Sequence, residues 1–299
     1  MPQGPPPKKI SYRAKTPTKC PVCKTEHFKE DLLSGGGRLI AGKLTQELRR
    51  LYEPSKKWGE IYPLAYTVQV CPKCLYAAYP KDFKGLNEEE LKAIKTTIPH
   101  REELMKVVFG NIDFNENRNL VLGAASYMLA IDCYHLRSWE MAPTVKKAVS
   151  SIRAAWLLGD LHKKFPARPY DKASNFYYVE AARGYARILD IMNGQGEEPI
   201  ESAAYMLGPD LDHNWGFDGI MYLNAYLTLH HLDEMADTLE QQYKILDTSK
   251  RYLSKLYGSG KASKSKPSVI VDMAKDLYDE MGEKLKEMEA QLNPAAASG

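Results

Sequence analysis

Two short stretches decide how the chain begins to fold: Cys20-Pro21-Val22-Cys23 and Cys71-Pro72-Lys73-Cys74. Each stretch, called a knuckle below, places two residues between its thiols, so that a tight turn can direct both sulfur atoms at one ion. Two knuckles supply four thiolates, and a tetrahedral set of four thiolates is a common site for structural Zn²⁺. The sequence therefore predicts one structural Zn²⁺ per chain, held by Cys20, Cys23, Cys71 and Cys74.

The residues around the knuckles bear on which metal they hold. A proline follows the first cysteine of each pair, where it fixes φ and lowers the entropy of the metal-free loop. The 47 residues between the knuckles do not exclude a shared site, because the entropic cost of closing a loop grows only logarithmically with its length. The knuckles are also similar to those of rubredoxins, which hold iron, but those have glycine directly after the second cysteine, where Lys24 and Leu75 stand here. A rubredoxin-like redox site is therefore the less favoured alternative.

The composition is that of a soluble globular protein, with 44% hydrophobic and 26% charged residues. Met1–Lys19 contains prolines and lysines rather than an apolar run, so we expect neither a secretory signal nor a membrane span. We expect a cytoplasmic protein. A reducing cytoplasm keeps thiols free, which favours metal ligation over disulfides.

Charge is distributed unevenly along the chain. Residues 1–84 contain 16 basic and 7 acidic side chains, a net charge of +9, whereas residues 85–299 contain 25 and 31, a net charge of −6. A basic N-terminal part can bind nucleic acid or an acidic partner. The side chains available for phosphate contacts and base stacking there are Lys19, Lys24, Arg49, Arg50, Tyr52, Lys56, Lys57, Trp58 and Lys73. Because no recognition helix accompanies them, we expect weak, nonspecific binding.

The N-terminal part has the pattern of short strands. Gly35–Gly37 permits a turn between predicted strands at Phe28–Leu33 and Arg38–Leu44. Alternation of large residues with smaller or polar ones over residues 64–70 predicts a further strand that leads directly into Cys71.

The pattern becomes helical after Gly85, where we place the domain boundary. Asn87 and Glu90 form a capping-box pair at the start of the first helix. Apolar periodicity then predicts helices at about 101–109, 118–137, 143–164, 171–193, 199–207, 217–231, 233–257 and 268–291. No strand is expected in this half.

The last two predicted helices each have one apolar seam. Apolar residues follow one another at steps of three and four from Leu239 to Tyr257, interrupted by Lys250, and again from Val271 to Leu292. Residues 258–267 have the composition of a flexible linker. We therefore expect the two seams to pack against each other antiparallel, with a seam facing a partner chain as the alternative.

Several segments resemble a bacterial family known only as domain of unknown function 2225. The resemblance covers Ile61–Ala78, Asp82-Phe83 and Cys20–Lys24. It implies paired knuckles followed by a tetratricopeptide-like helical region, and it implies no activity. The basic stretch Leu48–Tyr52 departs from the family, which has an acidic-aromatic segment there. Small and large apolar residues between Ile220 and Tyr243 also fall near tetratricopeptide positions, although a plain helical bundle would show similar ones.

Other constellations do not support catalysis. The Asp-x-x-His spacing occurs twice, at 132–135 and 210–213, without the glutamates that accompany it in dinuclear sites. Cys133 lies in a strongly apolar helix, which favours buried packing over nucleophilic chemistry. Gly258–Lys261 lacks the remaining residues of a phosphate-binding loop.

These observations predict an α+β, mostly α protein: a small zinc-ribbon-like module followed by an all-α, tetratricopeptide-like domain. The expected divisions are a tail (1–15), the module (16–84), the helical domain (85–257), a linker (258–267), a C-terminal amphipathic helix (268–292) and a second tail (293–299). We expect a non-enzymatic zinc-binding adaptor or scaffold that holds another protein, without a small-molecule substrate. The alternative is a nucleic-acid-binding protein. Because the halves have separate apolar patterns, we also expect the metal to support the module while the helical half folds without it.

Overall fold

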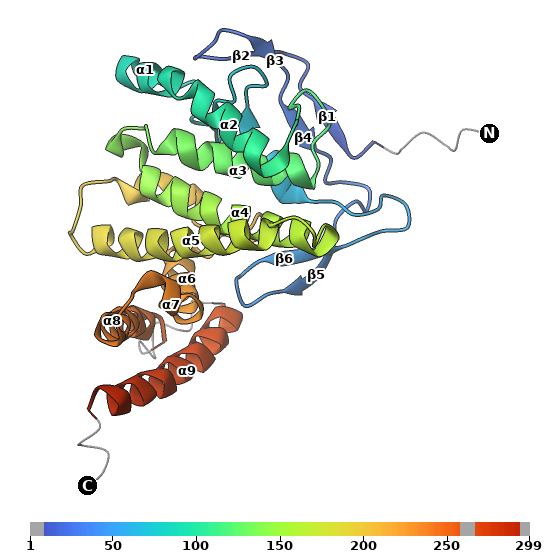
Figure 1. Ribbon diagram of the computed structural model, residues 1–299. Helices are drawn as coiled ribbons and strands as arrows, with labels where there is room; N and C mark the ends of the chain where they lie inside the picture. Colours follow the sequence, from blue (N-terminus) through green and yellow to red (C-terminus); the bar gives the residue numbers. More distant parts are fainter. Residues whose placement is uncertain (1–8, 258–266, 294–299) are drawn as a thin grey trace.

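The N-terminal third consists of small antiparallel sheets of two strands each. In the computed structural model, which describes residues 9–257 and 267–293, β1 pairs with β4, β2 with β3, β5 with β6 and β7 with β8. The strands are β1 Ser11–Arg13, β2 Thr18–Lys19, β3 Glu26–His27, β4 Glu30–Leu32, β5 Ile40–Leu44, β6 Arg50–Glu53, β7 Gln69–Val70 and β8 Ala77–Ala78. Figure 1 shows them along the edge of a much larger helical part, so the α+β, mostly α class is confirmed.

Two predictions for this part differ from the structure. The expected tail reaches too far, because Ser11–Arg13 pairs with β4; only residues 1–8 lie outside the described chain. The strand expected over residues 64–70 is wrong for its first half, where Pro63–Tyr66 forms the 3-10 helix η1. All four residues of η1 are buried. The alternation of large and small residues therefore does not correspond to one buried and one exposed face of a strand. Pro63 at the first position of η1 suits a helical turn.

The remainder of the described chain is helical, and no strand occurs in it after β8. Its helices are α1 Glu88–Thr96, α2 Ile98–Phe109, α3 Leu120–Tyr134, α4 Pro143–Lys164, α5 Tyr170–Met192, α6 Gly216–His230, α7 Leu232–Met235, α8 Leu239–Tyr257 and α9 Ser268–Leu292, with 3-10 turns η2 Trp139–Met141 and η3 Ile200–Met206. The capping box is confirmed, since Asn87 Oδ1 accepts the N–H of Glu90 at 2.9 Å and Glu90 Oε2 accepts that of Asn87 at 3.0 Å. The helix expected at 233–257 is two helices, and the one at 199–207 is η3.

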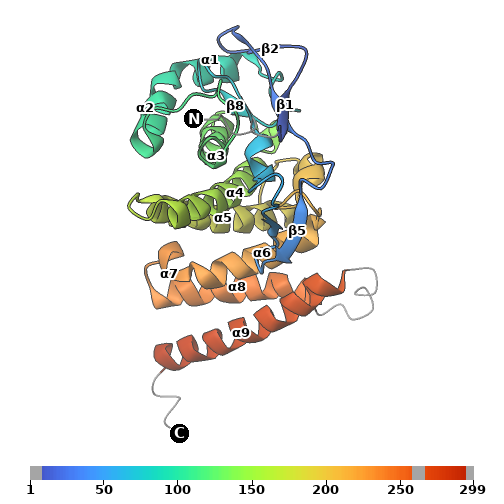
Figure 2. The same ribbon diagram turned by 90° about the vertical axis from the view of Figure 1, so that its right-hand side faces the viewer.

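The helices stack in chain order. Figure 2 shows α3, α4, α5, α6, α8 and α9 one below another, and each packs against the next. Stacking of sequential helices is the arrangement of helical repeat proteins, in which each unit contacts mainly its neighbours. No helix of the described residues is long and apolar enough to cross a membrane.

The last two helices pack as expected. Figure 2 shows α9 running back along α8, and the two helices are in contact. Lys250, the interruption in the α8 seam, is accommodated by Gly282 of α9: a Cβ atom at Gly282 would lie 2.6 Å from Lys250 Nζ. The ammonium also lies 4.3 Å from the centre of the Tyr278 ring. The linker prediction for residues 258–267 falls almost entirely outside the described residues, as does the second tail.

The N-terminal part and the helices share one core. Buried residues of the knuckles, β8 and η1 pack in the same cluster as those of α3, α4 and α5. Polar groups cross the boundary too: Asp82 accepts a hydrogen bond from Tyr134 at 2.6 Å and pairs with Lys146 at 2.7 Å. The sequence predicts that the helical half folds without the metal-binding part. The core that the two halves share leads us to replace that prediction with another, that they unfold together.

The segment between the knuckles contributes to this core. Its hairpin, β5 and β6, lies beside the helices, as Figure 1 shows, and Leu48 at its turn is fully buried. Glu47, next to Leu48, accepts hydrogen bonds from Trp156 of α4 and Tyr178 of α5. The long segment between the knuckles therefore contains a hairpin, residues 40–53, that lies along the helical stack and is called the arm below.

One close contact offers a test of this interface. A Cβ atom at Gly123 of α3 would lie 2.8 Å from Ala65 Cβ of η1 and 3.1 Å from Leu157. We expect Gly123→Ala to lower the free energy of unfolding by about 1–3 kcal/mol, because backbone must move to relieve the overlap. In the matched variant Gly159→Ala, the new methyl would be 3.5 Å from its nearest neighbour. That variant should gain up to about 1 kcal/mol from helix propensity. Urea unfolding followed by circular dichroism measures both, and equal effects would contradict the tight contact.

Candidate metal centre

The two knuckles have the same backbone structure. In the first, Lys24 N–H donates to Cys20 O at 3.0 Å, and in the second Leu75 N–H donates to Cys71 O at 3.0 Å. Both Lys24 and Leu75 have positive φ, 63° and 55°. Each knuckle closes a two-stranded sheet, β2 with β3 and β7 with β8. These positions are those at which rubredoxins have glycine, so the same turn forms here at some cost in backbone strain.

The knuckles bring their four sulfur atoms together. The four Sγ atoms all lie within 4.8 Å of one another. Cys20 and Cys74 are 3.7 Å apart, and Cys23 and Cys71 are 3.5 Å apart. Four thiolates about 2.3 Å from a tetrahedral ion lie about 3.8 Å from each other. The cluster therefore has the size needed to hold one metal ion, and all five cysteines are free of disulfides.

The cluster is closed to solvent on most sides. Cys20, Cys71 and Cys74 are buried, and only Cys23 is partly exposed. Hydrogen bonds from Cys20 and Cys74 lower the pKa of Cys71, whereas the bond to Cys71 raises the pKa of Cys20 to about 12. One thiolate is thus stabilised by its neighbours, and a metal ion must displace the remaining thiol protons.

Helix α2 supports the second knuckle through Arg101. This side chain is fully buried, and its Nη2 donates to Ile94 O at 2.8 Å and to Cys74 O at 3.4 Å. Its Nη1 lies 3.5 Å from the Asp132 carboxylate. Four thiolates around a divalent ion leave a net negative charge. A buried guanidinium beside the knuckle stabilises that charge. The sequence alone does not point to Arg101, because a lone arginine in a helix belongs to no recognisable motif.

The other constellations do not form sites. Among the described residues the four cysteines are the only cluster of potential metal ligands. Asp132 contacts His100 and Arg101 rather than His135, whose ring nitrogen lies 2.9 Å from Ile131 O. Asp210 accepts backbone N–H groups of the arm and its own turn. Burial raises the pKa of Cys133 to about 11, as expected for a packed thiol. Gly258–Lys261 lies outside the described residues.

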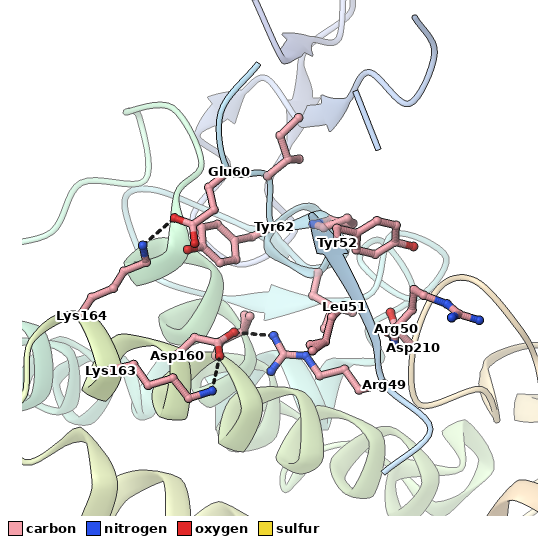
Figure 3. Close-up of a pocket in the computed structure, with 14 residues that line it drawn as sticks. Arg49, Arg50, Leu51, Tyr52, Glu60, Tyr62, Asp160, Lys163, Lys164 and Asp210 are labelled. Carbon is pink, nitrogen blue, oxygen red and sulfur yellow. Dashed lines mark hydrogen bonds and ion pairs between the residues drawn. The ribbon is translucent and has the colours of Figure 1, made fainter. Parts of the chain in front are cut away.

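The basic residues proposed for phosphate contacts are largely engaged within the chain. Figure 3 shows Arg49 directed at Asp160, with which it forms an ion pair. Arg50 Nε pairs with Asp212 at 2.8 Å. Lys57 and Arg38 both lie over the Trp58 ring, 4.8 Å and 4.1 Å from its centre. Two of these basic residues, Arg49 and Arg50, therefore pair with acidic side chains of the helical half.

The cavity drawn in Figure 3 has a volume of about 360 Å³ and lies between the arm, the segment before η1 and the end of α4. Its charged groups are paired: Lys163 with Asp160 at 3.3 Å within α4, and Lys164 of α4 with Glu60 of the N-terminal part. The pKa of Glu60 is lowered by its hydrogen bond from Lys164. A carboxylate held ionised by an ammonium is a poor proton acceptor, so Glu60 is not poised to act as a general base.

The chain matches a family of bacterial proteins and a relative of similar length. Residues 14–281 match the family described as "Uncharacterized protein conserved in bacteria (DUF2225)". An uncharacterized protein of Borreliella burgdorferi is 37% identical over 281 residues, which cover 94% of this chain and 99% of the relative. No solved structure matches the chain significantly.

We expect purified protein to contain one metal ion per chain and the double variant Cys71→Ser, Cys74→Ser to contain none. Metal analysis after purification without chelators measures this. The variant should also unfold at lower urea concentration in its helical circular dichroism, because the knuckles share a core with α3. Cys133→Ser is the matched control, since Cys133 is buried outside the cluster, and it should keep its metal. Metal retained by the double variant would contradict the site.

Proposed function

We propose that this chain, which belongs to the DUF2225 family of uncharacterized bacterial proteins, is a non-enzymatic, zinc-stabilised adaptor. In this proposal Zn²⁺ joins the two knuckles, and the helical stack holds a segment of another protein. The observation that carries the protein-binding role is a groove between α5, α6 and α8.

The metal assignment rests on the chemistry of the cluster. Four thiolates in a closed tetrahedral set suit Zn²⁺, which accepts this geometry and has no redox chemistry. A fully ligated ion has no position for water or substrate, so its role is to hold the fold. The knuckles also pack into the core rather than forming an exposed turn, with Cys20 and Cys71 fully buried. Iron in the same thiolates is the competing assignment.

The groove has the features of a peptide site. Its volume is about 460 Å³, and its walls include apolar side chains, among them Met235, Ile245 and Tyr252. Apolar walls of this kind accept side chains of a bound segment.

The floor of the groove is polar. Asn224 of α6 donates to Ser249 Oγ of α8 at 2.7 Å, and both residues are buried. Next to them, the buried Thr228 hydroxyl has no hydrogen-bond partner among the described residues. Amide and hydroxyl groups at the bottom of a groove suit the N–H and C=O groups of a peptide backbone. A polypeptide satisfies both the apolar walls and the polar floor.

The nucleic-acid alternative receives less support. Arg49 and Arg50, two of the residues expected to contact phosphates, form ion pairs with Asp160 and Asp212. Binding phosphate with either arginine would leave a partly buried carboxylate without its partner, which costs free energy.

The metal identity has a direct test. We expect elemental analysis of protein from its native cell to find zinc, and the protein to be colourless. Iron with thiolate charge-transfer absorbance in the visible range would replace the structural role by an electron-transfer one. Reconstitution with Co²⁺ provides a control, since tetrahedral thiolate coordination then becomes visible spectroscopically.

The groove has a separate test. Thr248 is an exposed residue at its edge, so Thr248→Arg should fill it without disturbing the core. Affinity purification from the native cell should recover a partner with wild-type protein and lose it with Thr248→Arg. Thr16→Arg, at an exposed position before the first knuckle, is the matched control and should keep the partner. Equal recovery by both variants, with helicity and metal content unchanged, would rule out the groove.

A further inference from the structure

A second cavity contains a buried cation. Arg153 of α4 is 4% exposed. Its Nε donates to Pro209 O at 2.8 Å, and its Nη2 donates to Gly208 O at 3.3 Å. Both acceptors are neutral carbonyl groups in the turn before α6. A guanidinium has five N–H groups, so these two bonds leave donors for the nearby Tyr79 and Tyr127 hydroxyls and for a ligand.

The charge of Arg153 has no ion-pair partner among the described residues. The rings nearest to it belong to Tyr79 and Tyr127, each with its centre 5.9 Å from the guanidinium carbon. Burial raises the pKa of both tyrosines, so both phenols are neutral at physiological pH and do not cancel the charge. Burying a charge without a counter-ion costs free energy. In proteins such a charge normally pairs with an opposite charge or with a bound ligand.

The nearby acid is already engaged. Asp210 lines the same cavity, but its carboxylate accepts the backbone N–H groups of Arg50 and Leu211, at 2.5 Å and 2.7 Å. Burial raises the pKa of Asp210, whereas its two backbone hydrogen bonds and the charge of Arg153 act in the opposite direction. Asp210 attracts Arg153 from beyond ion-pair distance, so the guanidinium has no direct ion pair with it.

The cavity has room for a small molecule. It has a volume of about 260 Å³ and is lined by side chains from both halves of the chain, including Thr67 and Tyr79 from the N-terminal part and Tyr205 from η3. Close by, the Tyr185 hydroxyl is fully buried and has no hydrogen-bond partner among the described residues. Aromatic walls around a single buried guanidinium are the surroundings that suit an organic anion.

We propose that this cavity binds a small organic carboxylate, whose two oxygens pair with the Arg153 guanidinium. The planar fork of arginine matches a carboxylate with two parallel hydrogen bonds. A carboxylate brings a single negative charge to Arg153, whereas a phosphate dianion would bring a second negative charge near the Asp210 carboxylate. The ligand would also contact both halves of the chain, which makes it a stabilising ligand of the assembled fold rather than a substrate.

The test uses the full-length, metal-loaded protein and two carboxylates, acetate and benzoate, at constant ionic strength. Isothermal titration should show saturable binding of at least one, together with a rise in melting temperature. The neutral isosteres acetamide and benzamide should not bind, and inorganic phosphate should bind at least tenfold more weakly than the better carboxylate. Equal binding of the amides, stronger binding of phosphate, or no saturable binding of either carboxylate would overturn the proposal.

Variants then assign the binding to Arg153. Arg153→Lys keeps the charge but loses the fork, and we expect at least tenfold weaker carboxylate binding. Arg153→Met removes the charge and should abolish binding; if it does not fold, the lysine variant decides. Arg50→Lys is the matched control, because its side chain pairs with Asp212 outside the cavity, and it should bind as wild type does. Unchanged affinity in Arg153→Lys would show that the arginine has only a structural role.

Discussion

The convergence of two knuckles on four sulfur atoms is the constraint on which the rest of the structure depends. Once the knuckles meet, the chain between them becomes a closed loop, and its hairpin lies along the nearby helices. That hairpin places Leu48 in the helical core and Glu47 between Trp156 and Tyr178. The second knuckle is followed at once by β8 and by Asp82, which pack on α3 and α4. A local coordination site therefore determines a long-range interface.

That interface is unusual in the amount of charge it buries. Arg101, Arg137 and Lys146 are all nearly inaccessible, and each contacts residues from before the Gly85 boundary. A buried ion such as Lys146 is tolerable because Asp82 and the ring of Tyr134 surround it. Removing the N-terminal part would take away these partners and expose the apolar surface of α3. The polar contacts thus link the two halves, even though each half has its own secondary-structure pattern.

The features that could be predicted from the sequence were those with a short-range signal. Cysteine spacing identified the cluster, periodicity located the long helices, and the Asn87–Glu90 pair located the start of α1. The rest depended on contacts between distant residues. Nothing near Gly282 in sequence indicates that it makes room for Lys250, and nothing near Arg153 indicates that it would be buried without a counter-ion. The error at η1 has the same cause, because packing against α3 and β4 buries all four residues of that segment.

Part of the uneven charge along the chain is used within the fold. A net charge of +9 before residue 85 and −6 after it suggested an external polyanion. In the structure, Arg49 and Arg50 of the arm instead meet Asp160 and Asp212 of the helical half. These pairs are only partly exposed, so salt screens them less than it screens surface pairs. The charge asymmetry favours docking of the arm onto the helices, and an external ligand is better sought where a charge remains unpaired, at Arg153, than where the sequence is most basic.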